Sequence, residues 1–196
     1  MIVNAAVEGT SDTGAARRVI EVAGHELARE PHVAGGKTRL DPKISKYNEA
    51  ARWGPWVVFR DSDARCPVEL RSKLTAAIRD WQPGFRLRIA HSMTEAWFLA
   101  DAEGFADYFG VSAAKVPANP ESLAHGKQSL LSLCRESYSR DIREEVVAAD
   151  GGAGPLFVDH LNEFAATRWD VEAASERSDS LRRAVERIRD LPGAVK

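Results

Sequence analysis

The chain has 196 residues, of which 44% are hydrophobic and 29% are charged, which suits one globular domain, or one domain with a helical extension. No stretch approaches the ~18 continuous apolar residues of a membrane span, and no basic segment followed by an apolar one opens the chain, so we expect a cytoplasmic protein. The net charge of −2 gives no global attraction to nucleic acid, so such a partner would have to meet a local basic patch. The cysteines, Cys66 and Cys134, are too few for a disulfide framework or a zinc site.

The first half of the chain alternates predicted strands and helices. Residues 2–7 form an apolar run that predicts a buried strand, and Thr10-Ser11-Asp12 then offers capping side chains for a helix that runs through Leu27. Further strands are predicted at 32–34, 56–59 and 85–89, and further helices at 41–52, 68–81 and 94–109. This alternation predicts an α/β fold with a mostly parallel sheet, in which ligands bind beyond the carboxyl ends of the strands.

After residue 118 the pattern predicts helices only. These helices are expected at 122–138, 155–168 and 171–191, and the last is amphipathic, with an apolar stripe that is either core or a partner surface. We therefore predict an α/β core over residues 1–118 and a helical extension over residues 119–196 that packs on it.

Acidic residues follow two of the predicted strands. Glu8 follows the first strand, and Asp61 and Asp63 follow the strand at 56–59. Carboxylates at one edge of a sheet repel one another, which raises their pKa values or requires a counter-ion, and a hard divalent cation is the usual solution. In extended backbone Asp61 and Asp63 point the same way. The pattern predicts a magnesium site, with Mn²⁺ as the alternative ion.

Asp12 lies four residues after Glu8, and its role has two interpretations. A tight turn into a helix would bring both carboxylates to one metal ion, or place them on either side of two ions. The alternative is that Asp12 is simply a helix cap.

Several short motifs accompany these acids. They are Val7-Glu8-Gly9, the spacing Glu8-x-x-x-Asp12, Asp61-Ser62-Asp63, Glu95-Ala96-Trp97-Phe98-Leu99-Ala100-Asp101, and Asn119-Pro120-Glu121 followed by Lys127. Together they resemble the Toprim fold, the Toprim nucleases of the OLD (overcoming lysogenization defect) family and, within that clan, an uncharacterised bacterial family of Toprim-like proteins. The resemblance covers most of the chain, with its specific motifs in the first two thirds.

The resemblance implies a magnesium-dependent hydrolase of phosphodiester bonds in DNA or RNA. Glu8, Asp61 and Asp63 would hold the metal, and Asp12 or Glu95 would complete a second site. The family setting also implies an ATPase partner and a role in phage defence. Two other functions stay open: a non-catalytic Toprim-like subunit of an ATPase complex, and a phosphohydrolase of small molecules. The choice of nucleic acid, endonuclease or exonuclease action, the number of metal ions, the oligomeric state and the need for a partner are also open.

Other residues of the motifs have competing interpretations. Glu95 either extends the acidic cluster or favours the positive end of its helix dipole. Asp101 more simply caps a helix or pairs with a basic side chain. Lys127 would neutralise charge on a phosphate, although a lone lysine on a helix is usually a surface residue. Trp97 and Leu99 are expected in the core.

Gly35-Gly36-Lys37-Thr38 superficially resembles a phosphate-binding P-loop. The full motif needs a glycine where this chain has Pro31, so we do not expect it to bind nucleotide phosphates. Lys37 and Arg39, with the lysines further along, could instead form a basic patch for a nucleic-acid backbone, against the alternative of a solvated loop. The histidines have no metal-ligand spacing, and no serine has the partners of a catalytic triad.

Overall fold

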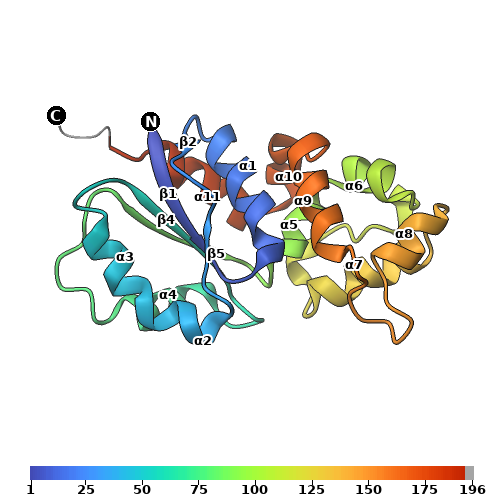
Figure 1. Ribbon diagram of the computed structural model, residues 1–196, viewed down its shortest axis with the longest axis horizontal. Helices are drawn as coiled ribbons and strands as arrows, with labels where there is room; N and C mark the ends of the chain where they lie inside the picture. The colour runs from blue at the N-terminus through green and yellow to red at the C-terminus, as the bar shows by residue number, and fades with distance from the viewer. Residues whose placement is uncertain (193–196) are drawn as a thin grey trace.

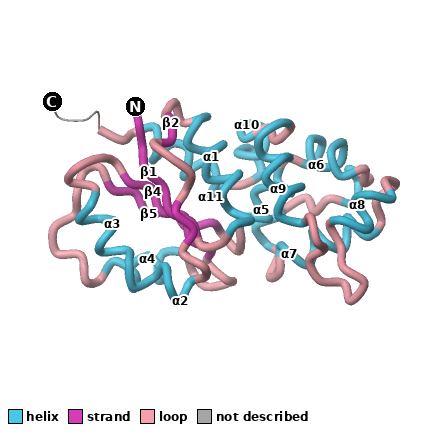
Figure 2. Tube along the Cα trace, in the orientation of Figure 1, coloured by secondary structure: helices cyan, strands magenta, loops and turns pink. Residues whose placement is uncertain are grey.

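A parallel sheet flanked by helices forms one half of the molecule in the computed structural model, which describes residues 1–192 (Figure 2). The strand order is β2-β1-β4-β5, and β3 pairs with the second half of β1. The strands are β1 (Ile2–Val7), β2 (Glu26–Leu27), β3 (His32–Val33), β4 (Trp56–Asp61) and β5 (Phe85–Ala90). All of these pairings are parallel, which confirms the predicted α/β fold with a mostly parallel sheet.

Helices cover both faces of this sheet. The α-helices within residues 1–192 are α1 (Thr13–Val22), α2 (Lys37–Leu40), α3 (Ile44–Ala50), α4 (Pro67–Thr75), α5 (Thr94–Ala100), α6 (Ala102–Phe109), α7 (Gly126–Arg135), α8 (Arg140–Glu145), α9 (Phe157–Thr167), α10 (Val171–Arg177) and α11 (Asp179–Arg189). In Figure 1 the sheet and α2–α4 lie at one end, α6–α9 lie at the other, and α11 returns to the sheet. No helix within residues 1–192 is long and apolar enough to cross a lipid bilayer.

The strands are apolar on both faces because each face has its own core. Val57 and Phe59 pack with α1, α9 and α11, whereas Val58 between them packs with α2, α3 and α4. Successive side chains of a strand point to opposite faces, so a continuous apolar run supplies both cores. β5 departs from this rule, because Phe85, Leu87 and Ile89 face one core and arginines occupy the positions between them.

The larger core joins the two predicted parts of the chain. Residues of β1 and α1 belong to the same buried cluster as residues of α9, α10 and α11. Phe98 on α5 stacks against Trp169 with ring centroids 4.9 Å apart. The helices after residue 118 therefore form much of the cover of one sheet face.

Two predicted long helices are each broken by a capping side chain. The helix expected over 94–109 divides at Asp101, whose side chain accepts a hydrogen bond from the amide of Gly104 and starts α6. This confirms Asp101 as a cap. The helix expected over 171–191 divides at Ser178, whose hydroxyl accepts from the amide of Leu181 and starts α11. Apolar periodicity runs through both breaks, so periodicity alone did not reveal them.

Other boundaries also differ from prediction. The helix expected to run through Leu27 ends at Val22, because Gly24 with a φ of 86° turns the chain and Leu27 then pairs with β1 in β2. The predicted helix over 68–81 ends at Thr75, and α2 lies partly in the predicted loop at 35–39. The predicted helix over 122–138 covers only α7, and α8 was not predicted.

Candidate metal site at the carboxyl edge of the sheet

Acidic residues from four segments of the chain gather where β1 and β4 end. Glu8 follows the last residue of β1, and Asp61 is the last residue of β4, its neighbour in the sheet. Asp12 ends the short 3₁₀ turn Thr10–Asp12, and Glu95 lies in the first turn of α5. The pKa of each of these four carboxyl groups is raised by burial and further by the charge of at least one of the others, so they form one electrostatic group, the acidic cluster.

Asp12 is buried within this cluster. Its Oδ2 accepts a hydrogen bond of 2.8 Å from the amide of Gly9, so its side chain bonds back toward the strand and not to the first amides of α1. Burial raises the pKa of Asp12 to about 6, and the charge of Glu95 adds to this effect. The structure thus gives Asp12 the turn-closing bond of a cap and a position in the acidic cluster.

Asp61 is held by the start of α5. Its Oδ1 accepts hydrogen bonds of 3.0 Å from both the amide and the hydroxyl of Thr94. Burial raises the pKa of Asp61 well above its ordinary range, and the carboxylates of Asp12 and Glu95 raise it further. Without another cation, Asp61 therefore holds its proton more tightly in the folded protein than in an unfolded chain.

Glu95 is 6% exposed and faces a positive charge from a distant part of the chain. Burial raises its pKa, and the charge of Lys127, at the start of α7, partly lowers it. The two helices meet closely: a Cβ added to Gly126 would lie 3.4 Å from the amide nitrogen of Ala96. Lys127 also lies over the ring of Phe157, with its Nζ 4.6 Å from the ring centroid. Glu95 and Lys127, which were predicted separately as site residues, are thus brought near one another.

Asp63 lies beside Glu8, whose pKa its charge raises, but its own carboxylate is held by basic side chains. We expected Asp61 and Asp63 to point the same way on extended backbone, but Asp63 has a φ of 50° and so leaves the extended conformation. Its Oδ2 accepts hydrogen bonds from Lys37 at 3.1 Å and Arg60 at 2.9 Å. Burial raises the pKa of Asp63, but these bonds outweigh it, so the pKa is lowered. Asp63 is therefore an ion-pair partner in this structure, contrary to the predicted orientation.

Arg60 is the counter-ion that sequence reasoning missed. Its side chain is completely buried, and it donates to both carboxylate oxygens of Asp41, at 2.8 and 3.3 Å, as well as to Asp63. Its NH1 also lies 3.2 Å from Oε2 of Glu8. Burial opposes the charge of Arg60, but the hydrogen bonds to Asp41 and Asp63 raise its pKa overall. An arginine inside the apolar run 56–61 was the available signal, since a charge there must be paired to be buried.

The glycine loop before α2 supports the end of β1. The amides of Gly35 and Gly36 donate to the carbonyl oxygen of Glu8, at 3.1 and 2.9 Å. They are occupied by backbone, which agrees with the prediction that this loop is not a P-loop. Lys37 pairs with Asp63, and Arg39 is exposed beside Gly35. The structure thus places Lys37 next to the site and leaves Arg39 at its rim.

The donor set at this edge suits a hard divalent cation in part. All its ligand atoms are carboxylate oxygens. Within residues 1–192, Oε2 of Glu8 is buried and accepts no hydrogen bond, and its charge is opposed by the Arg60 guanidinium 3.2 Å away. In the same described part of the chain, however, no three His, Cys, Asp or Glu side chains lie close enough together to hold one metal ion. The acidic side chains therefore lie at one edge of the sheet, but their carboxylates do not converge on one metal position.

Comparisons with known proteins add little. No protein-family model matches the chain, and no curated protein matches it. A solved structure, the C-terminal region of the OLD protein of Xanthomonas campestris pv. campestris, is similar over 96% of this chain and 94% of that chain, with 16% identity and a TM-score of 0.41. At these values the likeness carries no argument about residues or activity.

Proposed function

We propose that this chain is a metal-dependent phosphodiester hydrolase that acts on nucleic acid. The observation that carries the proposal is the acidic cluster: four carboxylates, two of them at the ends of neighbouring parallel strands, are gathered and partly buried. Positive charges that oppose theirs come from Arg60, Lys37 and Lys127. Such a group is stabilised when a divalent cation binds and its carboxylates lose their protons.

In this proposal Glu8, Asp12, Asp61 and Glu95 hold Mg²⁺, with Mn²⁺ as a substitute. Bound there, the ion would supply an activated water and stabilise the leaving oxygen of the phosphodiester. Thr94 fixes the carboxylate of Asp61, and Gly9 fixes that of Asp12, so both are oriented before any cation binds.

The basic residues have separate roles in the proposal. Lys127, beside Glu95, would neutralise charge on the phosphate. Arg60 and Lys37 hold Asp63 and shape the rim of the site, so Asp63 becomes a positioning residue and not a ligand. An ATPase partner and a role in phage defence come from the motif resemblance alone and extend the proposal.

The test is cleavage of labelled plasmid, single-stranded DNA and RNA with Mg²⁺ or Mn²⁺ and with EDTA. The double variant Asp12→Asn/Asp61→Asn should cut at least about 100-fold more slowly than wild type. Asn keeps an oxygen for the bonds from Gly9 and Thr94. Asp107→Asn/Asp159→Asn, which changes two exposed acids on α6 and α9, is the matched control and should cut like wild type.

Cation binding provides a second measurement. Magnesium titrated into wild type should raise its melting temperature, and the Asp12→Asn/Asp61→Asn variant should show little or no rise. Cleavage that survives in this variant would overturn the assignment of the site. Magnesium binding without cleavage of any polymer would favour the non-catalytic, ATPase-associated subunit instead.

A further inference from the structure

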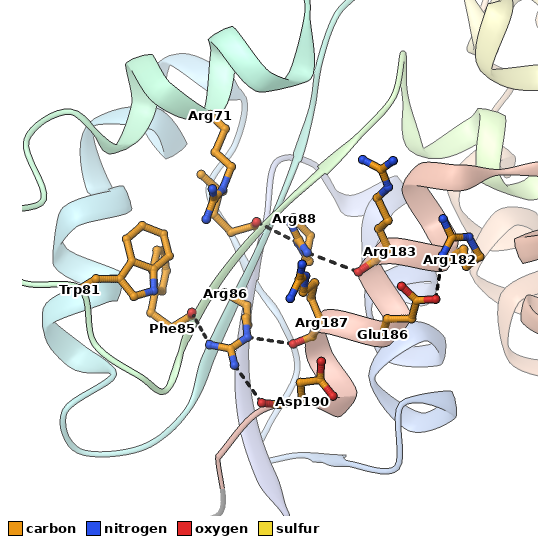
Figure 3. Close-up of a pocket in the computed structure, with 11 residues that line it drawn as sticks. Arg71, Trp81, Phe85, Arg86, Arg88, Arg182, Arg183, Glu186, Arg187 and Asp190 are labelled. Carbon is orange, nitrogen blue, oxygen red and sulfur yellow. Dashed lines mark hydrogen bonds and ion pairs between the residues drawn. The ribbon is translucent and has the colours of Figure 1, made fainter.

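A pocket rich in arginine lies between α4, β5 and α11, separate from the acidic cluster. Its volume is about 530 Å³, within the usual range for ligand sites. Figure 3 shows Arg71 reaching down from α4, Arg86 and Arg88 rising from β5, and Arg183 and Arg187 coming from α11. With Arg182 of α11, six arginines from three elements thus line the same hollow.

Part of this arrangement holds the helix on the strand. Arg86 donates to the carbonyl oxygens of Arg187 at 2.8 Å and Asp190 at 2.9 Å, and Arg88 donates to that of Arg183 at 3.3 Å. These bonds satisfy carbonyls in the last turns of α11 and explain why the strand carries arginine at these two positions. They do not neutralise the positive charges, because carbonyl groups carry no net charge.

The positive charges in the pocket are largely unbalanced. Within residues 1–192, no carboxylate forms an ion pair with Arg71, Arg86, Arg88 or Arg187. Two carboxylates also line the pocket: Glu186 is paired with Arg182, and Asp190 forms no ion pair within residues 1–192, although its charge opposes the burial that lowers the pKa of Arg86. Since the whole chain has a net charge of −2, this concentration of positive charge is local. Burial and the surrounding arginines lower the pKa of Arg88 to about 10, so an anion bound here would relieve their repulsion.

An aromatic side chain borders the arginines. Trp81 is 38% exposed, and the guanidinium of Arg71 lies over its ring, 5.2 Å from the centroid. Phe85 packs beside it, with ring centroids 5.1 Å apart. A partly exposed tryptophan next to basic side chains offers a face on which a nucleic-acid base can stack.

The pocket continues toward the acidic cluster. A second hollow of about 320 Å³ shares Arg71, Arg88 and Arg183 with the first and reaches His91. His91 follows Ala90, which pairs in register with Asp61. Both hollows follow the six residues of β5, an edge strand, so the groove is about 20 Å long, enough for several phosphates of an extended strand.

We propose that this groove binds the phosphate backbone of single-stranded nucleic acid, with a base stacked on Trp81, and leads the strand toward the acidic cluster. Arginine guanidinium groups match phosphate oxygens in geometry, and the combination of a basic groove with an aromatic platform is typical of single-strand binding. The inference rests on the proposed nuclease function for its biological meaning, but binding can be measured without cleavage.

The test is fluorescence anisotropy of a labelled 12-nucleotide oligo(dT) with the full chain in EDTA. The variant Arg71→Gln/Arg187→Gln should bind at least about tenfold more weakly, and its salt dependence should be shallower by about 1.4 in log–log slope for two lost phosphate contacts. Neither side chain donates a hydrogen bond within residues 1–192. Arg29→Gln/Arg168→Gln, which removes the same charge from exposed positions away from the groove, should bind like wild type. Trp81→Ala should weaken binding by about 5- to 100-fold.

Two other anions, dTMP and polyglutamate, serve as competitors that distinguish a nucleic-acid strand from a single nucleotide and from a general polyanion. The proposal would be overturned if dTMP or polyglutamate bound as tightly as oligo(dT). It would also be overturned if Arg71→Gln/Arg187→Gln and Arg29→Gln/Arg168→Gln lost the same amount of oligo(dT) affinity. Asp12→Asn/Asp61→Asn should retain oligo(dT) binding. If wild type cuts nucleic acid but Arg71→Gln/Arg187→Gln binds oligo(dT) as tightly as wild type does, the groove proposal is wrong and the hydrolase proposal stands. If wild type binds oligo(dT) through the groove but cuts no nucleic acid, only the hydrolase proposal is wrong.

Discussion

At the scale of single residues, Arg60 organises the rim of the acidic edge. Its buried guanidinium is shared among Glu8, Asp41 and Asp63, whose side chains are 19–27% exposed. A buried charge with several partners is weak evidence for net stability, but removal of one partner leaves the others uncompensated. The main contribution of Arg60 is therefore that it keeps the charges of Glu8, Asp41 and Asp63 compensated.

Arg60→Met should lower the free energy of unfolding by about 2–4 kcal/mol, because three partly buried carboxylates lose their shared cation. Urea unfolding measures this change. Arg52→Met is the matched control, since Arg52 pairs with Asp80 on the open surface and its loss should cost less than about 1 kcal/mol. Equal effects of the two substitutions would contradict the role given to Arg60.

The raised pKa of Asp12 predicts that the free energy of unfolding falls as the pH rises. Its pKa of about 6 in the folded protein lies above the ~3.9 of an unfolded chain, so between these values the folded state holds the extra proton. Stability from the protonated acid is therefore lost as the pH rises from about 4 to about 6. Asp12→Asn avoids this loss and should stabilise the metal-free protein above pH 6, on the order of 2 kcal/mol.

Urea unfolding in EDTA at pH values from 4 to 8 checks this prediction. The advantage of Asp12→Asn over wild type should be small near pH 4 and reach a plateau above pH 6. Asp107→Asn should show no such trend. An advantage that is constant across the range would mean that Asp12 is not protonated in the folded protein.

At the scale of elements, close helix contacts join the two ends of the chain. α1 approaches α9 so closely that a Cβ on Gly14 would lie 2.7 Å from Oδ1 and 2.9 Å from Cα of Asn162. The amide of Gly14 also donates to that Oδ1 at 2.8 Å. This glycine in the first turn of α1 is therefore required by packing, since a larger residue would collide with Asn162.

Gly14→Ala should destabilise the protein by about 1–3 kcal/mol, because overpacking outweighs the roughly 1 kcal/mol gained in helix propensity. Chemical denaturation is the measurement. Gly54→Ala provides the contrast: its Cβ would have one neighbour, Nδ2 of Asn4 at 3.8 Å, and its stability should stay within about 0.5 kcal/mol of wild type. A stabilised Gly14→Ala would show that α1 and α9 are less tightly packed.

At the scale of the whole molecule, one core spans the predicted boundary at residue 118. Phe98 of the first part packs against Phe164 and Trp169 of the second, and α11 is bonded to β5. The helical part is thus a structural layer of the sheet and also forms one wall of the arginine groove.

The full chain should therefore unfold in one transition, with coincident midpoints by far-ultraviolet circular dichroism and tryptophan fluorescence. A fragment of residues 1–118 should fail to unfold cooperatively, since it exposes the face that α9, α10 and α11 cover. A cooperative fragment would instead establish the first 118 residues as an independent domain.

The sequence by itself determined the parallel sheet and the residues at its carboxyl edge. Apolar runs predict the strands at 2–7 and 56–59, the second of which continues to Asp61 in the structure. A residue that follows or ends a strand must lie near the sheet edge, which is why Glu8 and Asp61 could be located. The caps at Asp101 and Ser178 were harder to foresee, because apolar periodicity continues through them.

The tertiary structure alone decided which side chains meet. The left-handed backbone of Asp63 turns it toward Arg60, and the contact of α5 with α7 brings Lys127 to Glu95 across 31 intervening residues. The arginine groove joins positions from Arg71 to Arg187. Local propensity carries no information about such contacts, because they depend on how distant elements pack and on where a buried charge finds its partner.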